Sequence, residues 1–301
     1  MTRVLVTGAT GNLGGAAVEQ LGKLLGPGAV VGLARDEAKA AQLRAQGVAV
    51  RVGDYADSAS LQAAMAGIDK VLLVTSSGRD DLLSHHRNVI EAADQTGVAH
   101  LAYVSYAVRD IETAALRSMF EAILDTEDVL RGSTIPAFTI LRNTQYADAI
   151  PFFVGAAALT HGFRIPAGEG RVPFALRREL GEAAANALVH DGHAGRTYEL
   201  TGAAGYTFAD VAAALSRYAG TEVAYEDVSV EEHTSTLAAF GLPPEAAAGL
   251  TAFITDMRDG HFDVESTDLA ALLGRRPTDL DAAIAETFAA GQQAFAVAPR
   301  S

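Results

Sequence analysis

The sequence predicts an α/β fold in which helices cover both faces of a doubly wound parallel sheet, with a smaller C-terminal α/β lobe. Three observations support this prediction. Short apolar runs alternate with segments of helical character along the first half of the chain. Several runs, such as residues 29–34 and 68–75, are almost continuously apolar, as is typical of strands buried on both faces. A glycine-rich turn joins the first run to the first helix.

The alternation predicts each element of the N-terminal half in turn. Apolar runs predict strands at residues 4–6, 29–34, 48–52, 68–75, 100–105 and 137–141. Amphipathic segments predict helices at residues 13–25, 36–45, 79–96 and 113–131, and Asp57 with Ser58 caps one more helix. In a sheet of this kind, ligands bind at the carboxyl ends of the strands.

The pattern is less regular in the C-terminal half. Residues 150–172 predict a helix followed by a pocket wall. A strand is expected at residues 197–200, and helices are expected at 178–190, 208–219, 230–239, 246–259 and 280–294. We therefore expect a dinucleotide-binding domain over residues 1–145 and a substrate-binding lobe over residues 146–301, which contributes some elements back to the main sheet.

Composition excludes several kinds of function. The net charge of −14 and the lack of a basic run argue against a nucleic-acid partner. The chain has no cysteine, which excludes a disulfide framework and thiolate chemistry. No apolar signal segment precedes the first strand, and the longest apolar stretch, residues 150–159, is too short to cross a bilayer. A cytoplasmic protein without a membrane partner is expected, and homodimer formation is left open.

Three glycines at a spacing of three follow the first strand. Gly8 permits the tight turn, Gly11 lets the backbone approach a pyrophosphate, and Gly14 lets the helix pack closely on the strand. This spacing is one residue longer than the G-x-G-x-x-G fingerprint. The free amides of the helix start favour an anion. The residues expected to bind the cofactor here are Gly8, Thr10, Gly11, Asn12, Leu13 and Gly14.

Arg35 ends the second strand, where a dinucleotide fold meets the adenosine ribose. An arginine can pair with a 2′-phosphate, so NADPH is the predicted cofactor. The neighbouring Asp36 speaks against this role, and a solvated charge at a helix start is the alternative.

Further cofactor contacts are expected at the ends of the third and fourth strands. Asp54 could accept from the adenine amino group beside Tyr55, or it could be a turn residue after Gly53. The small hydroxyl residues Thr75, Ser76 and Ser77 suit close passage of the ribose and pyrophosphate. The alternative is a plain polar turn with no role in binding.

The chain lacks the tyrosine with a lysine four positions on that many reductases of this architecture use to pass a proton. Hydride transfer to an already electrophilic acceptor is therefore favoured, with neutral donors for the developing oxyanion. The candidates for these donors are Ser105, Tyr106, Asn143 and Tyr146, and Asn143 could equally be a turn residue.

The sequence also bears on metals and on the acceptor pocket. His85 and His86 are adjacent on a helix and cannot face one metal together, so no metal site is expected. Phe152, Phe153 and Phe163 could line an aromatic pocket or could be core residues.

Several motifs in order resemble the NmrA-like atypical short-chain dehydrogenase/reductase family, and within it the type 2 NAD(P)H:quinone oxidoreductases and triphenylmethane reductases. They are residues 6–14, 34–36, 53–55, 67–70, 141–143, 197–201 and 272–275, which span almost the whole chain. The resemblance implies a Rossmann-like fold, NADPH on the glycine loop with the 2′-phosphate at Arg35, and a C-terminal lobe over the nicotinamide. It also implies two-electron reduction of quinones or dyes.

Three functions follow from the residues and the resemblance. The first is an NADPH-dependent reductase of a quinone or a similar conjugated aromatic acceptor. The second is a non-catalytic NADP(H)-binding redox sensor, as found among members of the wider family. The third is a tailoring reductase that acts on a polyketide or phenolic metabolite.

Overall fold

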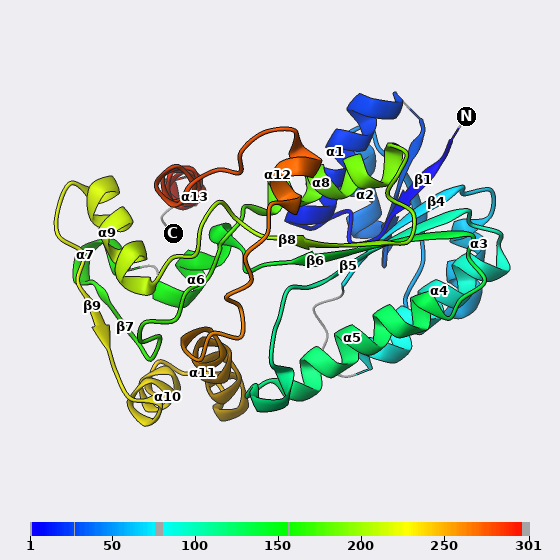
Figure 1. Ribbon diagram of the computed structural model, residues 1–301. Helices are drawn as coiled ribbons and strands as arrows, with labels where there is room; N and C mark the ends of the chain where they lie inside the picture. The colour runs from blue at the N-terminus through cyan, green and yellow to red at the C-terminus, as the bar shows by residue number, and fades with distance from the viewer. Residues whose placement is uncertain (1, 27, 76–80, 156, 297–301) are drawn as a thin grey trace.

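A seven-stranded parallel sheet forms the centre of the computed structural model, which describes residues 2–26, 28–75, 81–155 and 157–296 (Figure 1). The strand order is β3-β2-β1-β4-β5-β6-β8. The bounds are β1 (Val4–Val6), β2 (Val30–Ala34), β3 (Ala49–Val52), β4 (Lys70–Val74), β5 (His100–Tyr106), β6 (Ala137–Asn143) and β8 (Arg196–Leu200). The order reverses between β1 and β4, which places a crevice at their carboxyl ends.

Helices cover both faces of this sheet, so the predicted doubly wound architecture is confirmed (Figure 1). One face carries α1 (Asn12–Leu25), α2 (Glu37–Ala45), α8 (Arg177–Val189) and α12 (Asp268–Leu273). The other carries α3 (Ser58–Met65), α4 (Leu82–Gln95) and α5 (Arg117–Arg131). The inner strands β1, β2 and β4 are apolar except for Lys70, because both faces of the sheet are covered there.

The remaining elements form the smaller C-terminal lobe. Its helices are α6 (Ile150–Val154), α7 (Ala158–His161), α9 (Phe208–Ala219), α10 (Val230–Ala239), α11 (Pro244–Arg258) and α13 (Leu280–Ala296). A short parallel pair, β7 (Phe163–Ile165) and β9 (Tyr225–Asp227), completes it. Phenylalanines dominate its core, and Phe163 stacks on Tyr225 with ring centroids 5.3 Å apart. Phe163 is therefore a core residue and not a pocket residue.

Two segments of the C-terminal half return to the main sheet. The strand β8 pairs with β6 in parallel register, with Leu141 opposite Tyr198. The helix α8 packs along α1, where a Cβ on Gly181 would lie 2.5 Å from the carbonyl oxygen of Leu13. Glycine at position 181 thus permits the close approach that brings the start of α8 beside the glycine-rich turn.

Several bounds differ from the expected ones. The helix α5 begins at Arg117 and not near residue 113, because Asp256 accepts hydrogen bonds from the amides of Ala115 and Leu116 at 2.6 and 3.0 Å. Residues 150–172 form two short helices and β7 in place of one helix. The strands β7 and β9 were not predicted, since each is three residues long and contains charged residues, unlike the fully apolar β1. The helix α12 was not predicted either.

No helix of the described chain combines the length and the apolar character that crossing a bilayer requires.

Candidate active site

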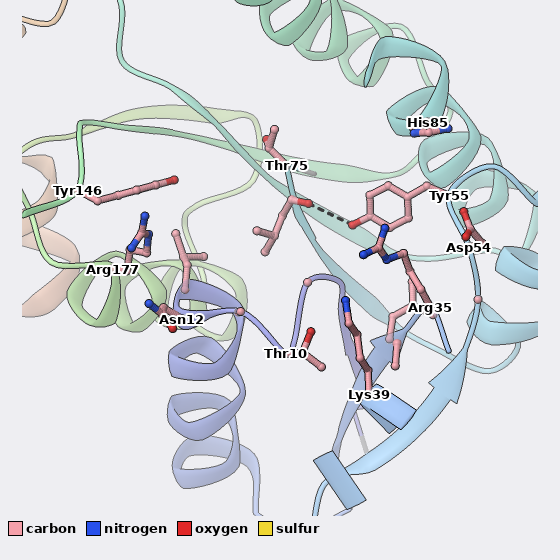
Figure 2. Close-up of a pocket in the computed structure, with 18 residues that line it drawn as sticks. Thr10, Asn12, Arg35, Lys39, Asp54, Tyr55, Thr75, His85, Tyr146 and Arg177 are labelled. Carbon is pink, nitrogen blue, oxygen red and sulfur yellow. Dashed lines mark hydrogen bonds between the residues drawn. The ribbon is translucent and has the colours of Figure 1, made fainter. Parts of the chain in front are cut away.

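A cavity of about 470 Å³ lies at the carboxyl ends of β1, β2, β3 and β4 (Figure 2). Figure 2 shows Arg35 and Lys39 toward one end of this cavity and Tyr146 with Arg177 toward the other. The turn between β1 and α1, with Thr10 and Asn12, lies between them. The cavity is thus elongated, with cationic groups at one end and the start of a helix at its middle.

The structure bears out the backbone roles of Gly8 and Gly14, whereas the approach of a pyrophosphate at Gly11 stays a prediction. Gly8 has a φ of +60°, which glycine adopts without strain. A Cβ on Gly14 would lie 2.2 Å from the carbonyl oxygen of Gly8, so only glycine allows α1 to approach the turn this closely. Gly11 is the N-cap of α1, and its amide donates to the Gly8 carbonyl at 2.9 Å.

The first turn of α1 differs from those of α2, α3, α9 and α10, and resembles those of α4 and α5. No side chain caps it, and its first turn contains no acidic residue. By contrast, the side chains of Asp36, Asp57, Thr207 and Ser229 accept hydrogen bonds from backbone amides at the starts of α2, α3, α9 and α10. The uncapped amides of α1 face the cavity and are suited to a pyrophosphate.

Arg35 and Lys39 both line the cavity beside the end of β2. Asp36 does not oppose them, because its Oδ1 accepts from the Lys39 amide at 2.9 Å and caps α2. Within the described residues, neither Arg35 nor Lys39 forms an ion pair. Lys39 was missed at the sequence level, although it stands one helical turn after Arg35, a spacing that places both on one side of a helix start. Two unpaired cations fit a phosphate on the adenosine ribose.

Asp54 and Tyr55 line the same end of the cavity. The Oδ1 atom of Asp54 accepts from the Ala56 amide at 2.9 Å, which is the turn interaction that the sequence left open. The Tyr55 hydroxyl donates to the Val74 carbonyl at 3.1 Å, as the dashed line in Figure 2 marks. Burial raises the pKa of Tyr55 above its ordinary value, so this hydroxyl stays protonated.

Thr75 lines the cavity at the end of β4, and its hydroxyl donates to the Val104 carbonyl at 2.5 Å. This bond ties the end of β4 to β5 and leaves only the acceptor side of the oxygen for a ligand. Ser76 and Ser77, which were predicted to bind beside it, lie outside the described residues.

The structure places Ser105 away from both cavities, so its predicted role as a donor to the acceptor is corrected. Its hydroxyl donates to Glu127 Oε1 at 2.5 Å, within a cluster that also contains Arg142. Ser105 and Tyr106 are neighbours on β5, and successive side chains of a strand point to opposite faces. Tyr106 therefore faces the C-terminal lobe.

Tyr146 and Arg177 form the far end of the cavity. The Arg177 guanidinium lies over the Tyr146 ring, with Cζ 4.3 Å from the centroid. Arg177 is the first residue of α8 and is held by Asp148, which accepts from its guanidinium at 2.9 Å and from its amide at 3.2 Å. Asp148 thus compensates the charge of Arg177 and fixes its position.

Asn143 is buried at the end of β6, and neither polar atom of its amide makes a hydrogen bond within the described structure. It lines neither cavity but lies next to Tyr146. Burial raises the pKa of Tyr146, while the Arg177 charge and the Asn143 amide oppose this rise. The outcome is a protonated phenol at neutral pH, able to donate a hydrogen bond.

A second cavity of about 600 Å³ adjoins the first, and Tyr146 and Arg177 line both. Its walls are mostly apolar, and Phe152, Phe153 and Phe253 are among the residues that form them. Tyr106, Gln145 and Glu245 supply polar groups. Burial raises the pKa of Tyr106 well above its usual value. An apolar, aromatic pocket with a few polar groups is suited to a planar conjugated molecule.

The histidines do not gather at a metal site. His85 lines the first cavity, whereas the adjacent His86 is buried against Tyr103, with ring centroids 5.4 Å apart. Along the part of the chain that the structure describes, no three His, Cys, Asp or Glu side chains come together in a way that could hold a metal ion.

Comparison with known proteins agrees with this geometry. The model of the NmrA-like family matches residues 1–281. Quinone oxidoreductase 2 of Escherichia coli is 36% identical over 95% of this chain and 98% of its own length. A crystal structure of an NADPH-dependent quinone oxidoreductase from E. coli, complexed with NADPH, has a TM-score of 0.87 at 34% identity over 95% of this chain and 99% of that one. A triphenylmethane reductase from Citrobacter sp., complexed with NADP(H), has a TM-score of 0.86 at 34% identity with the same coverage.

Proposed function

This chain belongs to the NmrA-like family, and on that premise we propose that it is an NADPH-dependent oxidoreductase that transfers hydride to a quinone or a similar conjugated aromatic acceptor. The observation that carries the proposal is that the two cavities meet at Tyr146 and Arg177. A dinucleotide along the first cavity then ends where an aromatic molecule in the second begins.

The first cavity supplies a separate group for each part of NADPH. Arg35 and Lys39 hold the 2′-phosphate, and the uncapped amides of α1 hold the pyrophosphate. Asp54 and Tyr55 contact the adenine end, and Thr75 contacts the ribose. The nicotinamide end is left at Tyr146 and Arg177, next to the second cavity.

NADPH, when bound, supplies the hydride. The protein orients the acceptor between the aromatic side chains of the second cavity and excludes water from it. Tyr146 donates a hydrogen bond to the oxygen that becomes negatively charged, since its raised pKa keeps the hydroxyl protonated. No lysine follows any tyrosine at the fourth position, so this donor does not depend on a neighbouring ammonium group.

We expect Tyr146→Phe to lower kcat for a quinone about 10- to 100-fold, because the ring is kept and only the donor is lost. The pKa of Tyr146 lies above the ordinary value of a tyrosine, so its hydroxyl stays protonated at neutral and mildly alkaline pH. The wild-type rate should therefore show no loss from this group between about pH 6 and 9. Steady-state rates at a series of pH values measure both effects. Tyr198→Phe is the matched control, since that hydroxyl binds His193 at 2.7 Å outside both cavities. An unchanged rate in the Tyr146 variant would remove its assigned role.

The proposed function is tested by following the absorbance of NADPH at about 340 nm with a panel of benzoquinones, naphthoquinones and triphenylmethane dyes. Steady oxidation that depends on both the protein and the acceptor supports it. Tight NADPH binding without turnover of any acceptor would instead identify a redox sensor. Turnover confined to one complex phenolic compound would identify a tailoring reductase.

A further inference from the structure

Gln145 contributes an unusual polar group to the wall of the second cavity. The side chain lines this cavity, although the residue is only 2% exposed. Its Nε2 atom is buried and has no hydrogen-bond partner within the described structure. A buried amide donor normally finds a partner, so one that lacks a partner at a cavity wall is suited to a ligand atom.

The backbone around Gln145 is fixed by three hydrogen bonds. The Thr144 amide donates to the Leu200 carbonyl at 3.0 Å, and the Gln145 carbonyl accepts from the Ala175 amide at 3.1 Å. The Ala147 amide donates to the Ala175 carbonyl at 2.8 Å. The side chain therefore starts from a rigid support, which a pre-positioned donor requires.

The surroundings of Gln145 indicate what it can bind. The neighbouring Tyr106 hydroxyl comes from β5 and lines the same cavity. Arg177 is compensated by Asp148, so it does not make this pocket strongly cationic. Glu245, at the start of α11, is exposed, and the other neighbours are aromatic, aliphatic or glycine. The ligand atom that fits a neutral amide donor here is a carbonyl oxygen on an aromatic ring system.

We propose that Gln145 is a specificity-determining residue that donates a hydrogen bond to a carbonyl oxygen of the acceptor, so that the site favours quinones over acceptors without oxygen. This inference rests on the proposed function and names its substrate class. Tyr146 and Gln145, which are adjacent in sequence, then provide two neutral donors of the pocket, in addition to the Tyr106 hydroxyl.

The two acceptor classes differ in what they need from this donor. A quinone gains a hydride and one proton, which comes from solvent, and becomes a hydroquinone as NADPH becomes NADP⁺. Negative charge develops on its oxygen during hydride addition, and an amide donor stabilises that charge. A cationic triphenylmethane dye takes up the hydride alone at its central carbon and gives the neutral leuco form, so no oxyanion develops.

The test compares both acceptor classes in Gln145→Met and Gln145→Leu, which remove the amide with different side-chain shapes. We expect kcat/KM for 1,4-naphthoquinone to fall about 10- to 100-fold, the scale of one hydrogen bond to a charged group. For a triphenylmethane dye such as crystal violet, we expect a change of less than about threefold, since the lost donor has no oxygen to bind. NADPH affinity, measured by calorimetry, should not change, because Gln145 does not line the first cavity.

Thr144→Val is the matched control. Thr144 is equally buried and its hydroxyl also lacks a partner, but it lines neither cavity. It should leave the ratio of the two acceptor rates unchanged. If both Gln145 variants lose quinone and dye activity equally, or lose neither, the inference is overturned while the proposed function stands. If the wild-type protein reduces neither acceptor, the proposed function itself fails.

Discussion

Replacing Gly14 with alanine is expected to weaken NADPH binding by about 3 kcal/mol or more, which is over 100-fold in the dissociation constant. The added Cβ would lie 2.2 Å from the carbonyl oxygen of Gly8 and 2.7 Å from its carbonyl carbon. Both atoms are backbone, so no side chain can rotate away. The helix α1 must move away from the turn, and its uncapped amides then no longer point at the pyrophosphate.

The neighbouring Gly15 provides the control for this substitution. A Cβ on Gly15 would meet only the Ala9 carbonyl oxygen, at 3.6 Å, which is an ordinary contact. Gly15→Ala should keep NADPH binding and raise stability by about 0.5 to 1 kcal/mol, since alanine favours the helix interior. Calorimetric titration with NADPH and thermal unfolding measure both variants. Equal affinities for the two variants would show that close packing at Gly14 is not needed for binding.

Arg35→Ala is expected to weaken NADPH binding by about 1.5 to 3 kcal/mol, or about 10- to 150-fold, and to leave NADH binding nearly unchanged. The guanidinium is free to bind the 2′-phosphate, because Asp36 is engaged in capping α2. Lys39→Ala should act in the same direction. The double variant should lose most of the preference for NADPH.

The control for Arg35 is Arg44→Ala. Arg44 also belongs to the region of α2, but it pairs with Glu37 at 2.8 Å and does not line the cavity. Titrations with NADPH and NADH, each at fixed ionic strength, give the two dissociation constants needed for each variant and for the wild-type protein. An equal loss of affinity for both nucleotides in Arg35→Ala would remove its role at the 2′-phosphate.

The sheet could be predicted from the sequence because most of its strands, such as β1, β2 and β4, are local apolar runs separated by segments of helical character. The C-terminal lobe was harder to predict. The strands β7 and β9 are three residues long and pair across about sixty positions, which no local pattern encodes. Capping by Asp256 likewise sets the start of α5 from a distant part of the chain.

The residues that line the nucleotide cavity could be predicted where they belong to a sequence motif. The glycine turn, Arg35 and Asp54 all line this cavity, as the strand ends indicated. The roles of Arg177 and Gln145 in lining the cavities were not predicted. Their placement depends on the start of α8 and the end of β6 lying close together in space, which the sequence does not show. The misplacement of Ser105 was avoidable, because two adjacent residues of one strand cannot face the same pocket.

The central claim is that the two cavities bring a nicotinamide and an aromatic acceptor into contact at Tyr146 and Arg177. Its most direct test is a single-turnover experiment in which protein loaded with one equivalent of NADPH is mixed with excess 1,4-naphthoquinone and followed at about 340 nm. The account predicts a first-order loss of one NADPH per chain, faster than in free solution. Bound NADPH that disappears no faster than free NADPH would contradict it.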